Sequence, residues 1–581
     1  MDGNSYWSRT LRQRLSRRRF LGALAAGGGA MAVGSLLVGC QEQGPSAQPP
    51  AAQEEAPRPG GILRLSATGS PPTLDPYRTM SFLTRGIAGG VYGNLFMSKG
   101  VPSDRFPSLE VEPDIAEGFE IADGGTTYVI RLRPNARFHP PLDRPVTAQD
   151  VVFSFERFLG RLPGVEPAPN RDQFDMVDSV QAPDDRTVVF KLRQPFASFL
   201  NRLADDYNAV IMPRETGSAF DPARIMVGAG PWIFVENVPG TVTRLRRNPA
   251  WHVDPKRPYL DSIEVNVVPE YATSLNQFLA GNLDMLNIQG EDVLRVREAV
   301  SGVQFDYVVN PYFGYISFAN LSGDRSSPWA DVRVRRAISM AIDHEAIFNT
   351  LYNAPQLRQA GFNIPFRQHN LIPAGSTGYW LDPNGPDIDP RVARYFKYDP
   401  QGARALLAEA GYPDGFSAPY HYTEIYGAGW KLVAELIPQY LARVGIRLRP
   451  VVEDYASVYV VRTFRGEYDG LAFQYQGFVE PGDYLTSMYT PGASRNHSKV
   501  NDPDLLRRIQ AIQANLNQED RRRQILQLQN ELADKMYYVP AVYDSGPQWS
   551  VAQRWVRGAF THRTARSGGY TQGYTRVWLI R

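Results

Sequence analysis

Residue types that commonly act in catalysis are scattered along this sequence instead of being grouped at recognised spacings. No two histidines lie four residues apart with a glutamate between them, so the zinc-protease pattern is absent. No glycine-rich loop ends in Lys followed by Ser or Thr, and no Gly-x-Ser-x-Gly nucleophile turn occurs. We therefore expect no catalytic residue, no metal site and no cofactor, and predict that the protein is not an enzyme. The seven isolated histidines are His139, His252, His344, His369, His421, His497 and His562.

The single cysteine, Cys40, excludes a disulfide framework or a thiolate metal cluster within one chain. It follows an uncharged run, residues 21–38, which itself follows a basic stretch. That order is typical of a secretory signal. Within the basic stretch, Arg17, Arg18 and Phe20 resemble the twin-arginine export signal. Residues 37–40 (LVGC) resemble a bacterial lipoprotein cleavage box, in which the cysteine becomes the acylated N-terminus.

We accordingly expect a signal peptide over residues 1–39 and a lipidated, Pro- and Ala-rich tether over 40–59. Each buried methylene of an acyl chain contributes about 0.8 kcal/mol, so two or more chains hold a protein on a bilayer. The alternative is a retained membrane span, but the run has only 18 residues and five of them are glycine. The localisation predicted is therefore an exported lipoprotein, anchored to the membrane and facing the periplasm or cell exterior.

The charge is unevenly distributed. Residues 1–40 carry a net charge of +5, which leaves −3 for the rest of the chain. A body with that balance is not expected to bind nucleic acid. Apolar residues make up 43% and charged residues 21% of the 581 residues, which fits a globular protein of about two to four domains.

Mixed α/β structure is expected from residue 60 onward. Alternating apolar and polar residues predict strands, at residues 61–66, 127–133, 186–192 and 263–267. Helix starts are indicated at Thr147, followed three residues later by Asp150, and at Asp399-Pro400, whose helix Gly411 should end. Apolar residues at helical spacing near Ile525 predict a further helix. Strands and helices are interspersed along the whole length. We therefore expect α/β lobes that are each built from more than one segment of the chain.

Several short blocks, in order and at characteristic spacing, resemble the solute-binding proteins of peptide, oligosaccharide and nickel importers, the oligopeptide- and dipeptide-binding class. The similarity covers about residues 59–545. The blocks include residues 59–64 (PGGILR), 72–76 (PTLDP), 91–95 (VYGNL), 113–119 (PDIAEGF), 132–139 (LRPNARFH), 147–154 (TAQDVVFS), 228–232 (GAGPW) and 331–338 (DVRVRRAI).

The resemblance implies a three-lobed α/β fold of the periplasmic-binding-protein type. Two lobes close on a ligand about a hinge, and a third is inserted near the N-terminus. The expected boundaries are 60–95, 216–305 and 541–581 for lobe I, 96–215 for lobe II and 306–540 for lobe III. The closed form would deliver a small organic ligand, such as an oligopeptide or oligosaccharide, to the membrane permease of an ABC-type importer. We expect a monomer.

The resemblance also suggests ligand-binding residues. In peptide binders a carboxylate pairs with the peptide amino group, and here that position is Gly477. A buried ammonium needs a paired charge, so either Glu480 or Asp483 supplies it from a shifted register, or the ligand has no free ammonium. Amide groups suit peptide bonds and sugar hydroxyls. The remaining candidates, each of which could instead be an ordinary strand, core or loop residue, are Gln474, Tyr475, Gln476, Tyr422, Glu424, Trp430 and Arg495.

Two other functions stay open on the sequence alone. A protein of the same fold could act as a sensor that reports its ligand to a membrane receptor. The other hypothesis is a surface hydrolase on a lipoprotein scaffold, which no residue pattern supports.

Overall fold

A computed structural model describes residues 56–102, 109–205, 210–309, 311–376, 378–477, 480–563 and 573–580. The chain divides into two units, Met1–Ala56 and Pro57–Arg581, and all elements named below belong to the second. The predicted export signal, the predicted lipidation site at Cys40 and most of the predicted tether lie outside the described residues. Within the described residues, none of the helices combines the length and the apolar character that crossing a bilayer requires.

The first sheet, here called the N-terminal sheet, has the order β1-β11-β10-β9. Strand β1 (Ile62–Ala67) pairs in parallel with β11 (Ser262–Val267), about 200 residues later in the chain. Strand β10 (Val242–Arg247) runs antiparallel to both β11 and β9 (Trp232–Val238). The alternation that predicted strands at 61–66 and 263–267 is confirmed, because Leu63, Leu65, Ile263 and Val265 are buried.

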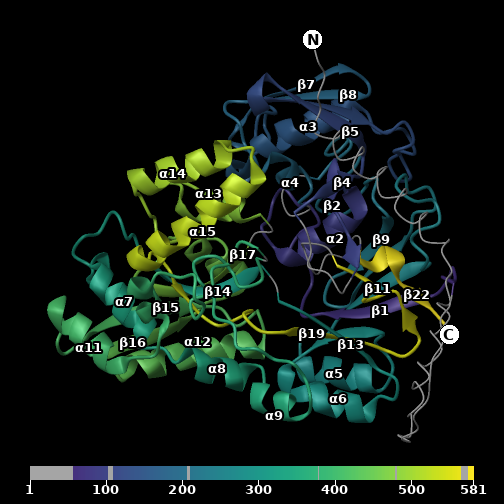
Figure 1. Ribbon diagram of the computed structural model, residues 1–581. Helices are drawn as coiled ribbons and strands as arrows, with labels where there is room; N and C mark the ends of the chain where they lie inside the picture. The colour runs from purple at the N-terminus through teal and green to yellow at the C-terminus, as the bar shows by residue number, and fades with distance from the viewer. Residues whose placement is uncertain are drawn as a thin grey trace, which may run out of the picture. The chain divides into compact units, whose positions relative to one another are not determined.

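A second, inserted sheet lies between β1 and β9 in the chain. Its four antiparallel strands have the order β5-β6-β8-β7. Strand β7 ends at Asp184 and β8 begins at Thr187, so a tight turn joins the two strands. Helix α3 (Ala148–Leu159) begins with the predicted capping box between Thr147 and Asp150. The bounds of these strands are Ala116–Ala122 (β5), Thr127–Leu132 (β6), Val177–Asp184 (β7) and Thr187–Leu192 (β8). In Figure 1 this sheet and α3 lie at the top in blue.

The third sheet, here called the large sheet, has the order β16-β15-β17-β14-β18. Strand β14 (Tyr312–Phe318) is buried at every position, which fits its place between β17 and β18. Helices pack on both faces of this sheet, with α12 and α8 on one side in Figure 1 and α13 to α15 on the other. The other strands are β15 (Phe416–Tyr422), β16 (Ile446–Val452), β17 (Leu471–Gly477) and β18 (Val539–Pro540).

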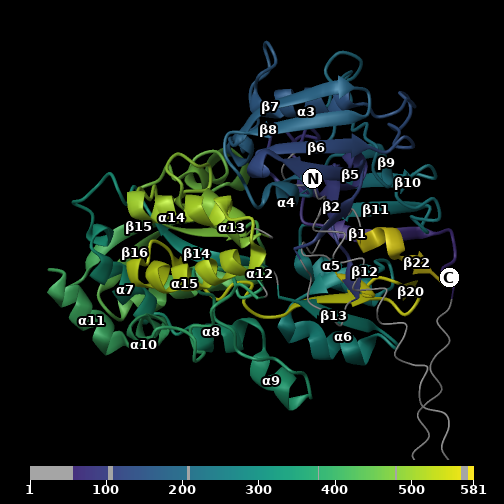
Figure 2. The same ribbon diagram turned by 45° about the horizontal axis from the view of Figure 1, so that its top comes forward.

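The fourth sheet, here called the crossing sheet, joins segments that are far apart in the sequence. Strand β19 (Gln548–Ala552) lies between β12 (Met285–Ile288) and β13 (Gln304–Val308) and is antiparallel to both. The chain passes from the crossing sheet to the large sheet after β13 and returns between β18 and β19. Figure 2 shows the yellow return segment running from the large sheet toward β12 and β13. We call the passage between β13 and β14 the first connector and the passage between β18 and β19 the second connector.

The remaining elements surround these sheets. Three two-stranded sheets pair β2 (Phe96–Ser98) with β4 (Val111–Pro113), β20 (Val556–Arg557) with β22 (Trp578–Leu579), and β21 (His562–Arg563) with β3 (Val101–Pro102). The helices not yet bounded are α2 (Phe82–Tyr92), α4 (Phe199–Leu203), α5 (Tyr271–Leu279), α6 (Val293–Ala299), α7 (Val332–Met340), α8 (His344–Leu351), α9 (Ala354–Gln359), α10 (Pro390–Ala393), α11 (Pro400–Glu409), α12 (Ala428–Ala442), α13 (Pro481–Tyr489), α14 (Pro503–Ala514) and α15 (Gln518–Lys535).

Two of these helices confirm predictions. The side chain of Asp399 caps α11, with Pro400 in its first turn, and Gly411 follows its end with a φ of 93°. Helix α15 buries Ile525, Leu528 and Leu532, the stripe that predicted it.

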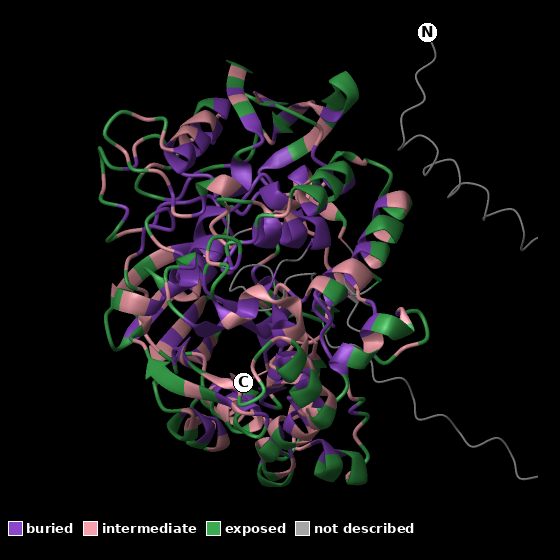
Figure 3. Cartoon of the chain, turned by 90° about the vertical axis from the view of Figure 1, so that its left-hand side faces the viewer, coloured by how far each residue is buried: buried purple, intermediate pink, exposed green. Residues whose placement is uncertain are grey.

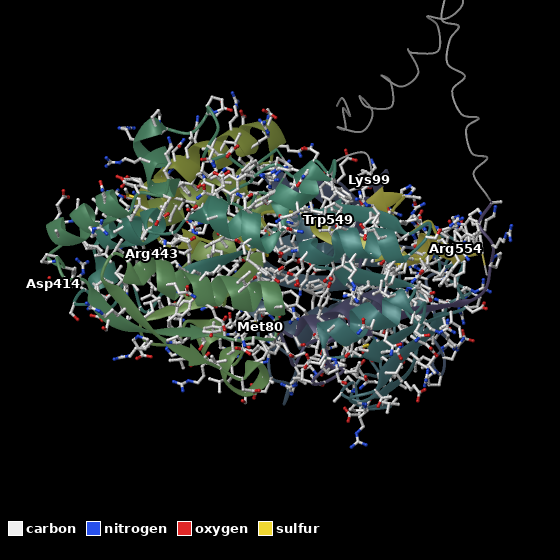
Figure 4. All side chains as sticks on the ribbon, turned by 90° about the horizontal axis from the view of Figure 1, so that it is seen from below. Met80, Lys99, Asp414, Arg443, Trp549 and Arg554 are labelled. Carbon is white, nitrogen blue, oxygen red and sulfur yellow. The ribbon has the colours of Figure 1, made fainter. Side chains whose placement is uncertain are left out.

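Buried apolar residues form two large clusters and a smaller one. One large cluster lies around the large sheet, the other spans the N-terminal and inserted sheets, and the smaller covers the crossing sheet. Figure 3 shows buried segments inside and exposed helix faces outside. A separate small cluster joins Met80, which precedes α2, to Tyr459 and Phe464, which follow β16. Figure 4 labels Met80 where green and purple parts of the ribbon meet. This contact brings two distant parts of the chain together beside the connectors.

Candidate functional site

Strand β17 carries four of the predicted ligand residues and separates them onto two faces. Successive side chains of a strand point to opposite faces, so Tyr475 lies on one face and Gln474 and Gln476 on the other. Both glutamines are buried. Gln474 Nε2 donates to the carbonyl of Thr463 at 2.9 Å. Among the described residues, Gln474 Oε1 and Gln476 Nε2 have no hydrogen-bond partner. Burying a polar atom without a hydrogen-bond partner costs free energy of folding. Because these atoms lack partners, Gln474 keeps an unused acceptor and Gln476 an unused donor.

The ring of Tyr475 lies at the centre of a group of aromatic side chains. Its centroid is 5.7 Å from Tyr312, 5.3 Å from Tyr426, 5.8 Å from Trp430 and 5.6 Å from Tyr543. We call these five residues, with Tyr455 and Tyr459, the aromatic cluster, because both contact the ring of Tyr426. Rings in such edge-to-face and offset arrangements give a rigid apolar wall with hydroxyl groups at its margin.

The structure therefore brings the predicted Tyr475 and Trp430 together, but places Tyr422 and Glu424 elsewhere. Tyr422 is buried at the end of β15 and contacts Tyr420. Glu424 is exposed and forms a surface ion pair with Lys431 at 2.8 Å.

Gly477, where the resemblance expects a carboxylate, is held as glycine by the main chain around it. A Cβ atom at this position would overlap the carbonyl oxygen of Pro311 and the Cα of Tyr312, beside the first connector. Main-chain atoms in a sheet cannot move aside as a flexible side chain can. The lack of a carboxylate at this position thus follows from the close passage of the connector.

Glu480, the N-cap of α13, is buried and already paired. Its Oε2 accepts a hydrogen bond from Ser198 Oγ at 2.5 Å, and its Oε1 lies 3.0 Å from Arg521 Nη2. It also accepts from the backbone N–H of Asp483 at 2.8 Å. These contacts leave Glu480 as part of the packing between α13, α15 and the segment just before α4.

Asp483 is likewise buried and paired, with Arg202 of α4 at 2.8 Å. Burial raises the pKa of Asp483 to about 7 and Glu480 acts in the same direction, whereas Arg202 opposes the shift. Ser487 of α13 adds a hydrogen bond to Gln173 at 3.1 Å. The two carboxylates offered as possible ammonium partners therefore both join the inserted region to α13.

Arg495 follows α13 and lies over the ring of Phe464, with its Cζ 5.0 Å from the ring centroid. It is half-buried. Phe464 belongs to the small cluster with Met80 and Tyr459, so Arg495 lies where the segment before α2 meets the residues after β16.

Sequence reasoning missed Asp544 in the second connector. Tyr475 donates its hydroxyl proton to Asp544 Oδ2, and Gln548 donates to Oδ1. Burial raises the pKa of Asp544 to about 7, although both hydrogen bonds act in the opposite direction. Asp544 thus fixes Tyr475 of the aromatic cluster to the connector, and no local sequence pattern marks it.

His421 is the histidine with the richest polar surroundings. Its Nδ1 lies 2.7 Å from Glu453 and its Nε2 3.0 Å from Asp469. Burial alone would lower the pKa of His421, but the two carboxylates outweigh it and raise the pKa. Across the described parts of the chain, no group of three or more His, Cys, Asp or Glu side chains is placed to hold a metal ion.

Comparison with known proteins settles the family. Residues 110–496 match the family described as bacterial extracellular solute-binding proteins, family 5. The chain belongs to this family. The resemblance inferred from the sequence blocks is confirmed, and the family binds solutes outside the cytoplasm.

Family 5 relatives and structures agree with this assignment. Heme-binding protein A of Haemophilus influenzae is 26% identical over 464 residues, which are 76% of this chain and 80% of that protein. The dipeptide-binding protein of Escherichia coli is 25% identical over 420 residues, covering 68% and 73%. The periplasmic binding protein DppA of Helicobacter pylori, solved with the peptide STSA, matches the fold with a TM-score of 0.75 at 22% identity. That match covers 90% of this chain and 99% of DppA, and confirms the predicted α/β binding-protein fold.

Proposed function

We propose that this family 5 protein captures a peptide-like or other small organic solute and delivers it to the permease of an ABC importer. The observation that carries the proposal is the aromatic cluster, which gathers side chains from the large sheet and from the second connector. Named relatives bind heme and dipeptides, and an apolar wall with hydroxyl groups at its margin suits solutes of that size.

Closure about the two connectors is the mechanism we propose. A chain that crosses between two bodies at few points can rotate there while each sheet stays intact. The lobe boundaries expected from the sequence, with lobe III at 306–540, lie close to these two passages. The ion pair between Arg202 and Asp483 would then tie lobe II to lobe III in the closed form.

We further propose that the protein binds its solute without turnover and works as a monomer tethered through acylated Cys40. The chemistry of solute capture needs only noncovalent contacts, and release unchanged into a permease requires no reacting group. Export through the twin-arginine signal is part of the same proposal.

Solute binding is tested first by native mass spectrometry of the purified protein, which reveals any compound carried from the cell. Thermal shift and calorimetry with peptide and saccharide panels then measure affinity. Binding at 100 times Kd should stabilise the protein by about 2.7 kcal/mol. Small-angle scattering should show a smaller radius with saturating solute. A protein that binds no compound of any class would contradict the proposal.

The anchor has a separate test. Labelled palmitate should be incorporated into the wild type and lost in Cys40→Ala, which should be released into the soluble fraction. Label that persists in Cys40→Ala would refute acylation at this residue.

A further inference from the structure

The charged side chains near α13 divide into paired and unpaired groups. Arg202 pairs with Asp483, and Arg521 pairs with Glu480. Arg495 differs, because within the described part of the chain its guanidinium has neither an ion pair nor a hydrogen bond. Its Nε is buried without a partner.

The contact with Phe464 sets the orientation of the Arg495 guanidinium. A guanidinium stacked on a ring uses its flat face, and its N–H groups point outward from the edge. Five donors in a planar fork match the two oxygens of a carboxylate. Arg495 is half-buried, so these donors are partly shielded from water yet still reachable.

The ring of Phe464, on which Arg495 stacks, lies 6.0 Å from the ring of Tyr459 in the aromatic cluster. Burial lowers its pKa, while Asp172 and the hydroxyls of Tyr426 and Tyr455 act electrostatically in the opposite direction. Asp172 is the carboxylate that acts on Arg495, but it forms no ion pair with it. The Oδ2 of Asp172 accepts from Gln173 Nε2 at 3.0 Å and from the backbone N–H of Ser494 at 3.3 Å.

We propose that Arg495 binds an acidic group of the solute, a carboxylate held by two parallel N–H···O bonds, while the aromatic cluster contacts the solute's apolar body. The inference rests on the proposed solute-binding function and names the chemical class of the solute. Glu480 and Asp483 are occupied by arginines and Gly477 has no side chain. Recognition therefore depends on a negative group and needs no free ammonium.

Pairs of probes that are alike in structure but differ in charge test this directly. We would measure Kd by calorimetry for three pairs, each an acid and its uncharged counterpart: N-acetyl-Phe-Tyr and its C-terminal amide, 3-phenylpropionate and 3-phenylpropionamide, and cellobionate and cellobiose. Phe-Tyr amide supplies a free ammonium without a carboxylate. In at least one pair the acid should bind tenfold or more tightly than its partner, and its affinity should fall as salt rises.

Variants of Arg495 then assign the preference to this side chain. Arg495→Gln should weaken binding of the acid at least tenfold and leave the uncharged partner unchanged. Arg495→Lys keeps the charge but loses the planar fork of donors, so its affinity for the acid should lie between those of the wild type and Arg495→Gln. This variant serves as the test if the glutamine variant does not fold. Arg447→Gln is the control, because Arg447 is an exposed arginine on β16 of the large sheet.

The outcomes are distinct. If uncharged or ammonium probes bind as tightly as acids, or if Arg495→Gln keeps the preference for acids, the inference on the solute's charge is wrong while solute binding stands. If no probe binds and native mass spectrometry finds no cargo, the inference and the proposed function both fail.

Discussion

The ion pair between Arg202 of α4 and Asp483 of α13 offers a quantitative test of how the inserted region is held. The side chains are 1% and 7% exposed. The Asp483→Ala variant would leave the Arg202 guanidinium buried, with its remaining described partner the carbonyl of Gln173. Breaking a buried pair by removing one partner costs about 3–5 kcal/mol. We expect a loss of that size in the free energy of unfolding.

The matched control is the pair of Arg186 and Glu117, which lies on the inserted sheet. These side chains are 51% and 56% exposed at a similar N–O distance of 2.8 Å. Exposed pairs contribute about 0–1 kcal/mol, so Glu117→Ala should barely change stability. The double variant Arg202→Met/Asp483→Leu should regain most of the loss, because apolar side chains of similar volume remove both buried charges.

Urea unfolding at pH 7.5, followed by tryptophan fluorescence and circular dichroism, measures these differences. The two signals should be compared, since a chain with several sheets need not unfold in one step. The reasoning is refuted if Asp483→Ala and Glu117→Ala lose the same free energy within about 0.5 kcal/mol. It also fails if the double variant is no more stable than Asp483→Ala alone.

Three further predictions follow from single residues. The raised pKa of His421 means that its stabilising effect is complete below about pH 6.5 and is lost as pH rises through the folded-state pKa. His421→Gln should flatten this decline in urea unfolding between pH 5.5 and 9, and parallel profiles would contradict it. Asp544, with a folded pKa of about 7, disfavours folding when ionised. Asp544→Asn should therefore stabilise the protein at pH 8 by at most about 4 kcal/mol, with the gain vanishing near pH 4. A gain that does not change with pH would count against this account. A Cβ at Gly228 would overlap the main chain of Val91, so Gly228→Ala should melt well below wild type, whereas Gly118→Ala, which faces open space, should not. Equal melting temperatures for the two alanine variants would contradict the packing argument.

Much of the fold could be predicted from the sequence because its signals are local. Alternation at Leu63 and Leu65 and the capping residues Thr147 and Asp399 act within a few residues, so they survive in almost any tertiary context. The pairing of β1 with β11 is different, since nothing within either strand indicates a partner about 200 residues away.

The site was harder to predict because its contacts are long-range. Tyr475 and Trp430, two of the ligand residues suggested from the sequence, lie together. The pairing of Asp483 with α4 depends on an arginine 281 positions earlier, which no pattern near residue 483 reveals. Asp544 is isolated in the sequence, and only the fold places it against Tyr475.

The position of β19 has a consequence for how the protein is made. This strand lies between β12 and β13, yet it is synthesised some 240 residues after β13. While the ribosome is still extending the chain, β12 and β13 have no common neighbour, and their edges remain open to pairing with other chains. Assembly of this region must therefore wait until nearly the whole polypeptide has emerged, and a nascent chain released before residue 548 could not complete it.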